Sequence, residues 1–238
     1  MLSKADIRFL KSLSYKKTRD ELGLFIVEGE KMVDEAKKSD FLLERILYMK
    51  DIGEVDMSKI TLLSSPSPVF AILRRKDYPA SIAIDSDKIY LALDSVRDPG
   101  NLGTIIRLAD WFGIEAIIAS DDTVDMYNPK VIQASMGAIF RTKMVYTNLY
   151  DFIGKNSDKT EIYGTFLNAS NIYRESLSGS GIIVIGSESN GISAEVESLI
   201  KKKLFIPSFT GKAGCGSESL NVAIATAIVC SEFRRSSV

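Results

Sequence analysis

Histidine is absent from the chain, and cysteine occurs only at positions 215 and 230. The lack of histidine excludes catalytic triads and general bases built on imidazole, together with histidine-ligated metal centres. Two cysteines are too few for a zinc site or a disulfide framework, so we expect no metal and a reducing, cytoplasmic environment. Cys215 has no evident activating base beside it and is expected to be incidental to catalysis.

Long hydrophobic runs and a strong charge of either sign are also missing. No run approaches the roughly 18 apolar residues of a membrane span, and charged residues interrupt the apolar positions of the N-terminus. We therefore predict neither a membrane segment nor a signal peptide. Apolar residues make up 45% of the 238 positions and the net charge is −1, so a core is expected and any nucleic-acid contact must come from a local patch.

The chain from residue 87 to residue 238 alternates apolar runs with helical stretches. Several runs are apolar at consecutive positions, which is typical of parallel strands covered on both faces. The expected strands span residues 89–94, 114–120, 143–147, 161–166, 181–186 and 203–207, and the expected helices span 104–112, 192–202 and 220–235. This alternation predicts an α/β domain with a parallel sheet and right-handed crossovers.

Residues 1–86 are expected to form a smaller α/β domain. Short strands are predicted at residues 24–29, 43–49, 60–64 and 81–86, and a Ser/Pro turn followed by a short helix at residues 64–70. The polar stretch at residues 85–88 lies between two apolar runs, so the domain boundary is placed there.

Three glycine- and serine-rich loops follow expected strands of the larger domain. The first begins after Asp94, the second at Gly186 and the third after Pro207. Because the carboxyl ends of parallel strands meet at one edge of a sheet, where ligands bind, we expect the three loops to lie together. None of them has the glycine pattern of a dinucleotide or P-loop site, which argues against a nucleotide-dependent oxidoreductase.

These loops carry a family resemblance. The segments LDSVRDPGNLGTIIRLADWFGI, IGSESNGIS and IPSFTGKAGCGSESLNVAIATAI resemble the three motifs of the SpoU/TrmH family of RNA ribose 2′-O-methyltransferases, in the family's order. QASMGAIFR, between the first two, also resembles the family pattern, and residues 11–36 resemble its N-terminal RNA-binding domain. The resemblance implies a SPOUT-type trefoil knot near the C-terminus, S-adenosylmethionine as cofactor and a homodimer formed through the C-terminal domain.

The resemblance also implies roles for individual residues. Gly186, Ile206 and Leu220 match cofactor-contacting positions, and Asn101, Arg107, Glu188, Ser219 and Asn221 match functional positions. The third loop is longer than the family spacing between Pro207 and Ser219. The same residue types also have purely structural uses. Asn221, Ser219 and Glu188 could cap helices, Asn101 could be a turn former and nothing more, and Arg107 could be a surface residue.

The chemistry of methyl transfer fits these residue types. A sulfonium is a strong methyl donor, so the enzyme must chiefly hold the ribose 2′-oxygen in line with the methyl group and favour loss of its proton. Similar enzymes are often described with the arginine as a general base. Arginine is protonated in proteins, so Arg107 is better suited to binding the adjacent phosphate and stabilising negative charge on the oxygen.

A basic N-terminal segment is the candidate RNA contact. The first 19 residues contain one acidic residue, Asp6, and six basic ones: Lys4, Arg8, Lys11, Lys16, Lys17 and Arg19. Lys4, Arg8 and Lys11 have the spacing of one helix face, which predicts phosphate contact, or alternatively a solvated basic face. The last helix is apolar nearly all round over residues 220–233 and is expected either in the core or against a partner.

We therefore predict an S-adenosylmethionine-dependent methyltransferase acting on a ribose 2′-oxygen, in ribosomal RNA rather than tRNA. A tRNA ribose methyltransferase and a non-catalytic RNA-binding protein on the same fold are the alternatives. The N-terminal RNA-binding resemblance and the lack of a basic extension after the last motif favour ribosomal RNA.

Overall fold

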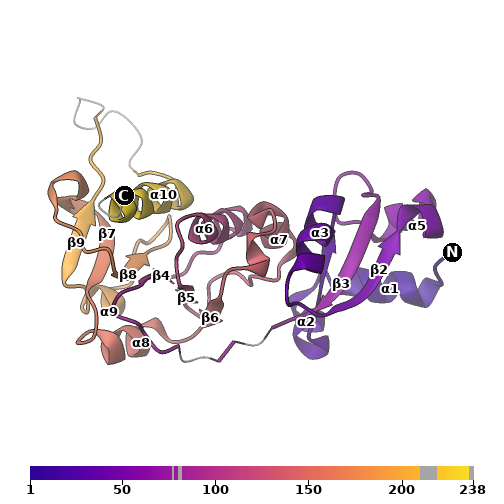
Figure 1. Cartoon of the computed structure of the whole chain (residues 1–238), viewed down its shortest axis with the longest axis horizontal. Helices are drawn as coiled ribbons and strands as arrows, with labels where there is room; N and C mark the ends of the chain where they lie inside the picture. The colour runs from indigo at the N-terminus through magenta and orange to yellow at the C-terminus, as the bar shows by residue number, and fades with distance from the viewer. Residues whose placement is uncertain (77, 80–81, 210–218, 236–238) are drawn as a thin grey trace.

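The computed structural model describes residues 1–76, 78–79, 82–209 and 219–235. It contains two sheets that lie side by side along the longest axis of the molecule (Figure 1). Among the described residues, no helix is long and apolar enough to span a membrane. The segment between the two sheets, where the predicted boundary at residues 86–87 falls, has neither helix nor strand in its described part.

The N-terminal part is a three-stranded antiparallel sheet of order β1-β3-β2 with helices around it. Its elements are α1 (Lys4–Ser12), α2 (Lys16–Leu22), β1 (Leu24–Glu28), α3 (Glu30–Lys38), β2 (Leu43–Tyr48), α4 (Met49–Ile52), α5 (Glu54–Ile60) and β3 (Val69–Arg74). A capping box between Ser3 and Asp6 starts α1. Gly23, with φ of 64°, ends α2 in a left-handed conformation that favours glycine.

Both faces of this sheet are buried. Along β1, Ile26 belongs to a cluster with residues of α1 and α5, whereas Phe25 and Val27 belong to a core shared with the C-terminal part. The alternation follows from the two-residue period of a strand. The two sheets therefore share one continuous core, with α3 and α7 between them (Figure 1).

Three elements expected in this part are wrong. Residues 60–64 form the end of α5 and a loop, because the Glu28 carboxylate accepts hydrogen bonds from the Thr61 hydroxyl at 2.5 Å and the Leu62 amide at 2.8 Å. The segment after the Ser/Pro turn is the central strand β3 and no helix, since its side chains are buried on both faces of the sheet. The described residues 82–86 contain no strand.

The C-terminal part confirms the predicted α/β fold with a parallel sheet. Six strands in the order β6-β5-β4-β8-β7-β9 are all parallel. The strands are β4 (Ile89–Leu93), β5 (Ala116–Ala119), β6 (Met144–Tyr146), β7 (Ile162–Asn171), β8 (Gly181–Ile185) and β9 (Lys202–Phe205). Every residue of β4, β5 and β8 is buried, as their continuous apolar runs predict.

The helices of this part are α6 (Pro99–Trp111), α7 (Pro129–Ser135), α8 (Leu149–Asn156), α9 (Ala194–Glu197) and α10 (Val222–Arg235), with 3₁₀ turns η1 (Ala138–Phe140) and η2 (Ile172–Arg174). The expected helix at residues 192–202 is much shorter, because tight turns after Glu197 lead the chain into β9. Helices α7 and α8 were not predicted. The trefoil knot stays a prediction, since residues 210–218 of the third loop lie outside the described residues.

Candidate active site

Two loops and the described ends of a third meet at the carboxyl edge of the parallel sheet. Loop 1 (residues 94–98) joins β4 to α6, loop 2 (186–193) joins β8 to α9, and loop 3 (206–221) joins β9 to α10. Loops 1 and 2 are connected directly, because the Asp94 carboxylate accepts a hydrogen bond from the Ser193 amide at 2.8 Å. Strands β4 and β8 are neighbours in the sheet, so this contact follows from their parallel pairing.

A chain of side-chain hydrogen bonds joins residues from all three loop regions. Asn101, in the first turn of α6, donates through its side-chain amide to a carboxylate oxygen of Glu188 in loop 2. The Asn101 side-chain oxygen accepts from the Asn221 amide at 2.9 Å. We call this chain, Glu188–Asn101–Asn221, the relay. It brings together residues separated by 87 and 120 positions in the sequence.

The direction of every hydrogen bond in the relay is fixed from one end. The Asn221 side-chain oxygen accepts from the backbone amides of Ala223 (3.0 Å) and Ile224 (3.3 Å), as an N-cap of α10 does. Its NH₂ group must therefore face Asn101, whose own NH₂ group then faces Glu188. Helix capping and site assembly coexist in Asn221, and the relay requires an acceptor oxygen on Glu188.

Loop 2 folds tightly back on the end of β8. Ser187 and Gly191 exchange two backbone hydrogen bonds of 3.0 Å. A Cβ on Gly186 would lie 2.2 Å from the carbonyl carbon of Gly191 and 2.3 Å from the amide nitrogen of Ile192. Only glycine fits at this position, so Gly186 is required for the loop conformation that presents Glu188.

A second polar cluster supports loop 1 and was not predicted from the sequence. Ser95 has φ of 60°, an uncommon conformation for a residue other than glycine. Its hydroxyl donates to the Asp122 carboxylate, which also accepts from Ser120 at 2.7 Å and Arg97 at 2.7 Å. The hydrogen bonds from Arg97 and then Ser120 lower the pKa of Asp122 to about 2. The polar pair Asp121–Asp122 after β5 marks a turn in the sequence. No sequence signal, however, links Asp122 to Ser95.

Arg107 lies apart from the relay. It is exposed, and within the described part of the chain no hydrogen bond or ion pair joins it to Asn101, Glu188 or Asn221. Arg107 shares one face of α6 with Thr104 and Trp111, at spacings of three and four residues. The structure therefore places Arg107 on the helix that carries Asn101, but on a different side.

Two of the candidate cofactor residues, Ile206 and Leu220, lie at the described ends of loop 3 and are apolar. Ile206 is half-buried against the core, Leu220 is 46% exposed and Phe209 is 86% exposed. Apolar side chains that are open to solvent suit a ligand with a planar apolar base. These residues therefore fit an adenosyl group. Ser219 is exposed beside Leu220.

Cys230 has no part in this site. Cys215 lies outside the described residues, and Cys230 is fully buried in α10. Burial raises the pKa of the Cys230 thiol to about 12, so it stays protonated and unreactive at neutral pH. Among the described residues, no group of three or more acidic or cysteine side chains is placed to hold a metal ion.

The basic N-terminal segment divides into exposed and buried members. Lys4, Arg8 and Lys11 of α1 are exposed, as are Lys16 and Lys17 of α2, which pair with Asp20 and Glu21 one helical turn away. Arg19 is only 1% exposed and forms an ion pair with Asp125. The expectation that Arg19 contacts RNA is therefore corrected, because its guanidinium is enclosed by protein.

The chain is similar to known proteins along most of its length. Residues 88–231 match the SpoU rRNA Methylase family and residues 4–83 the MRM3-like substrate binding domain. The 23S rRNA (guanosine(2553)-2'-O)-methyltransferase RlmP of Bacillus subtilis is 31% identical over 241 residues, which cover 94% of each chain. A structure from Porphyromonas gingivalis described as an RNA methyltransferase of the TrmH family has a TM-score of 0.86 at 36% identity, over 99% of both chains. An AdoMet-bound rRNA methyltransferase from Sinorhizobium meliloti has a TM-score of 0.86 at 28% identity, over 100% of this chain and 97% of its own.

Proposed function

The chain belongs to the SpoU rRNA methylase family, and we propose that it transfers a methyl group from S-adenosylmethionine to a ribose 2′-oxygen in ribosomal RNA. The family membership confirms the resemblance carried by the three sequence motifs. The observation that carries the proposal is the relay, because it joins all three motif regions through side chains of Glu188, Asn101 and Asn221.

The relay gives the site an ordered set of donors and acceptors. Each asparagine amide has two N–H donors and uses one of them in the relay, so a second donor is left for substrate or cofactor. Such donors, fixed before the substrate arrives, orient a ribose hydroxyl without reorganisation during the reaction. We propose Asn101, Glu188, Ser219 and Asn221 as the residues that position the reacting groups.

Proton removal is the step for which Arg107 is proposed. When bound, S-adenosylmethionine supplies an activated methyl group on a sulfonium. Arg107 binds the phosphate next to the target ribose and stabilises negative charge on the 2′-oxygen as its proton leaves. The RNA phosphate or a water molecule accepts the proton, since the chain has no histidine to do so. Gly186, Ile206 and Leu220 are the proposed cofactor contacts.

Ribosomal RNA is the proposed substrate class, held by the exposed lysines and Arg8 of α1 and α2. Two features support this choice over tRNA: residues 4–83 match the MRM3-like substrate binding domain, and RlmP of B. subtilis is named for 23S rRNA. A cytoplasmic location remains an expectation from the sequence.

A homodimer through the C-terminal part is proposed from the surface of α6 and α10. The two helices pack together, and each leaves a large apolar side chain exposed: Trp111 is 83% exposed and Ile224 is 53% exposed. Arg107 lies on the Trp111 face of α6, so a second copy on this surface would come close to the proposed phosphate contact. Sedimentation as a monomer at micromolar concentration would contradict this proposal.

Ribose-methylation mapping of total RNA, from cells with and without the protein, tests the function. We expect one ribose of ribosomal RNA to lose its methyl group when the protein is absent. Complementation with an Asn101→Ala variant should leave that ribose unmethylated, whereas Asn148→Ala, which removes an asparagine side chain that caps α8 and has no contact with the relay, should restore methylation. Calorimetric titration with S-adenosylmethionine separates an enzyme from a pure RNA-binding protein, which need not bind the cofactor.

A further inference from the structure

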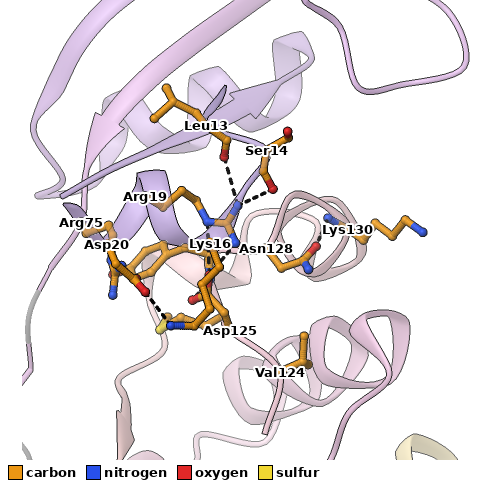
Figure 2. A network of polar contacts seen from close by, with 12 residues as sticks. Leu13, Ser14, Lys16, Arg19, Asp20, Arg75, Val124, Asp125, Asn128 and Lys130 are labelled. Carbon is orange, nitrogen blue, oxygen red and sulfur yellow. Dashed lines mark hydrogen bonds and ion pairs between the residues drawn. The ribbon is translucent and has the colours of Figure 1, made fainter. Parts of the chain in front are cut away.

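An ion pair between Arg19 and Asp125 connects the N-terminal part of the chain to the C-terminal part, which carries the relay. Arg19 belongs to α2, and Asp125 lies in the segment between β5 and α7 (Figure 2). The Arg19 Nη2 and Nε atoms donate to Asp125 Oδ2 at 2.7 and 3.2 Å. The two side chains are 2% and 6% exposed. Water therefore does not compete for this contact, unlike for the ion pairs at the surface.

The same guanidinium also holds the turn between α1 and α2. Its Nη1 atom donates to the carbonyl oxygens of Leu13 (3.0 Å) and Ser14 (2.7 Å), at the end of α1 (Figure 2). One planar group thus binds a carboxylate of one domain and two backbone carbonyls of the other. A lysine ammonium lacks the fork geometry to make all of these contacts.

The Asp125 side of the contact is fixed as well. Asp125 Oδ1 accepts from the Tyr127 amide at 3.0 Å, and the Tyr127 ring lies 4.7 Å from the ring of Phe25 in β1. On another side of the junction, Arg141 binds Glu35 of α3 and Asp110 of α6. The N-terminal domain is therefore held at two separate places, which opposes rotation about either one.

The turn held by Arg19 carries the proposed RNA-binding groups. Lys11 and Lys16 flank the turn and are exposed, and Tyr15 between them is 69% exposed. A buried ion pair contributes little net stability compared with apolar packing. Here the further hydrogen bonds of both partners, to the Leu13 and Ser14 carbonyls and from the Tyr127 amide, define how the two side chains meet. The contact therefore sets where the basic surface lies relative to the relay.

We propose that Arg19 is a positioning residue. Its contact with Asp125 fixes the distance and orientation between the RNA-binding α1–α2 turn and the methyl-transfer site, and so selects the ribose that is methylated. This inference rests on the proposed methyltransferase function. The ligand class is a structured RNA that contacts the α1–α2 turn and the relay at once.

The test uses the full-length protein and ribosomal RNA from cells that lack it. Asp125→Asn keeps the Tyr127 hydrogen bond but places a neutral amide against Arg19. We expect kcat/KM for the target ribose to fall about 10- to 100-fold through a higher KM for RNA, with methylation appearing at neighbouring riboses. Binding of S-adenosylmethionine should be unchanged. Glu44→Gln, which removes an exposed ion pair with Arg74 inside the N-terminal domain, is the control.

Stability and positioning are separated by a second variant. The double variant Arg19→Met/Asp125→Asn removes both charges, so its melting temperature should be closer to that of the wild type than the melting temperature of Arg19→Met alone. It should nevertheless still methylate neighbouring riboses. All assays are run well below the melting temperature of each variant. Should Asp125→Asn not fold, the double variant and Arg19→Lys carry the test. Folded variants that methylate the wild-type ribose with an unchanged kcat/KM would overturn the inference. A wild type that transfers no methyl group to RNA would instead refute the proposed function.

Discussion

Between the N-terminal and C-terminal parts the guanidinium of Arg19 is enclosed by Asp125 and two backbone carbonyls, whereas Arg107, farther along α6 than Asn101, is exposed and separate from the relay. Both arginines belong to segments that the sequence links to RNA. Their surroundings differ in one respect: Arg19 has all its contacts within the chain, and Arg107 has its charge available to a ligand. We infer that the first sets geometry and the second takes part in chemistry.

The largest expected effect on stability is at the junction. Arg19→Met leaves Asp125 buried without its partner, so the free energy of unfolding should fall by about 3–5 kcal/mol. Chemical denaturation monitored by circular dichroism measures this. Arg74→Met, which removes an exposed ion pair with Glu44, should cost less than about 1 kcal/mol. Equal losses for the two variants would show that burial of the Arg19 pair has no special consequence.

Arg107→Ala should reduce activity without reducing stability. We expect kcat for RNA methylation to fall about 10²- to 10³-fold, because charge on the 2′-oxygen loses its stabilising partner. The melting temperature and the affinity for S-adenosylmethionine should be unchanged, since Arg107 is exposed. Arg235→Ala, which removes an exposed arginine at the end of α10, is the matched control. Substantial remaining activity of Arg107→Ala would remove this residue from the mechanism.

A smaller effect is expected for the loop that presents Glu188. Gly186→Ala introduces a Cβ that overlaps the backbone of Gly191 and Ile192, so the protein should lose about 1–3 kcal/mol of stability. Calorimetry should also show weaker binding of S-adenosylmethionine. Gly154→Ala in α8 is the control, because its Cβ would meet only a side-chain atom of Leu199 at 3.8 Å. Alanine favours a helix, so that control should be neutral or stabilising.

The smallest effect is expected for the exposed cations of α1. Joint reversal of Lys4, Arg8 and Lys11 to glutamate should weaken RNA binding and lower the slope of log affinity against log salt by roughly two to three. Filter binding over a salt series measures it. The control reverses three exposed lysines of α3: Lys31, Lys37 and Lys38. If both triple variants bind RNA alike, general charge repulsion explains the loss and the α1 surface is not the contact.

The parallel sheet and the meeting of the three loops were predictable from the sequence. Continuous apolar runs identify strands buried on both faces, and parallel pairing places their following loops at one edge. Strand β3 was mistaken for a helix because a Ser/Pro turn precedes it and its pairing partners are distant in sequence. The sequence predicts a helix at residues 192–202 that is longer than α9, because the apolar periodicity continues into β9 without a break.

The site was only partly predictable for a related reason. Family motifs identify Asn101, Glu188 and Asn221, but the hydrogen bonds that connect them depend on backbone amides at the start of α10. Arg19 looks like its lysine neighbours in the sequence. Its partner Asp125 is 106 residues away, so only the packed structure separates it from the exposed basic residues.

Product analysis of a methyl-transfer reaction tests the central claim most directly. The wild-type protein is incubated with S-adenosylmethionine carrying an isotopically labelled methyl group and with ribosomal RNA from cells that lack the protein, and the RNA is digested to nucleosides. The relay and the family membership predict that mass spectrometry finds the label in one 2′-O-methylated nucleoside, and that Arg107→Ala nearly abolishes it. Label on a base, or no label in RNA at all, would contradict a ribose methyltransferase site at the three-loop edge.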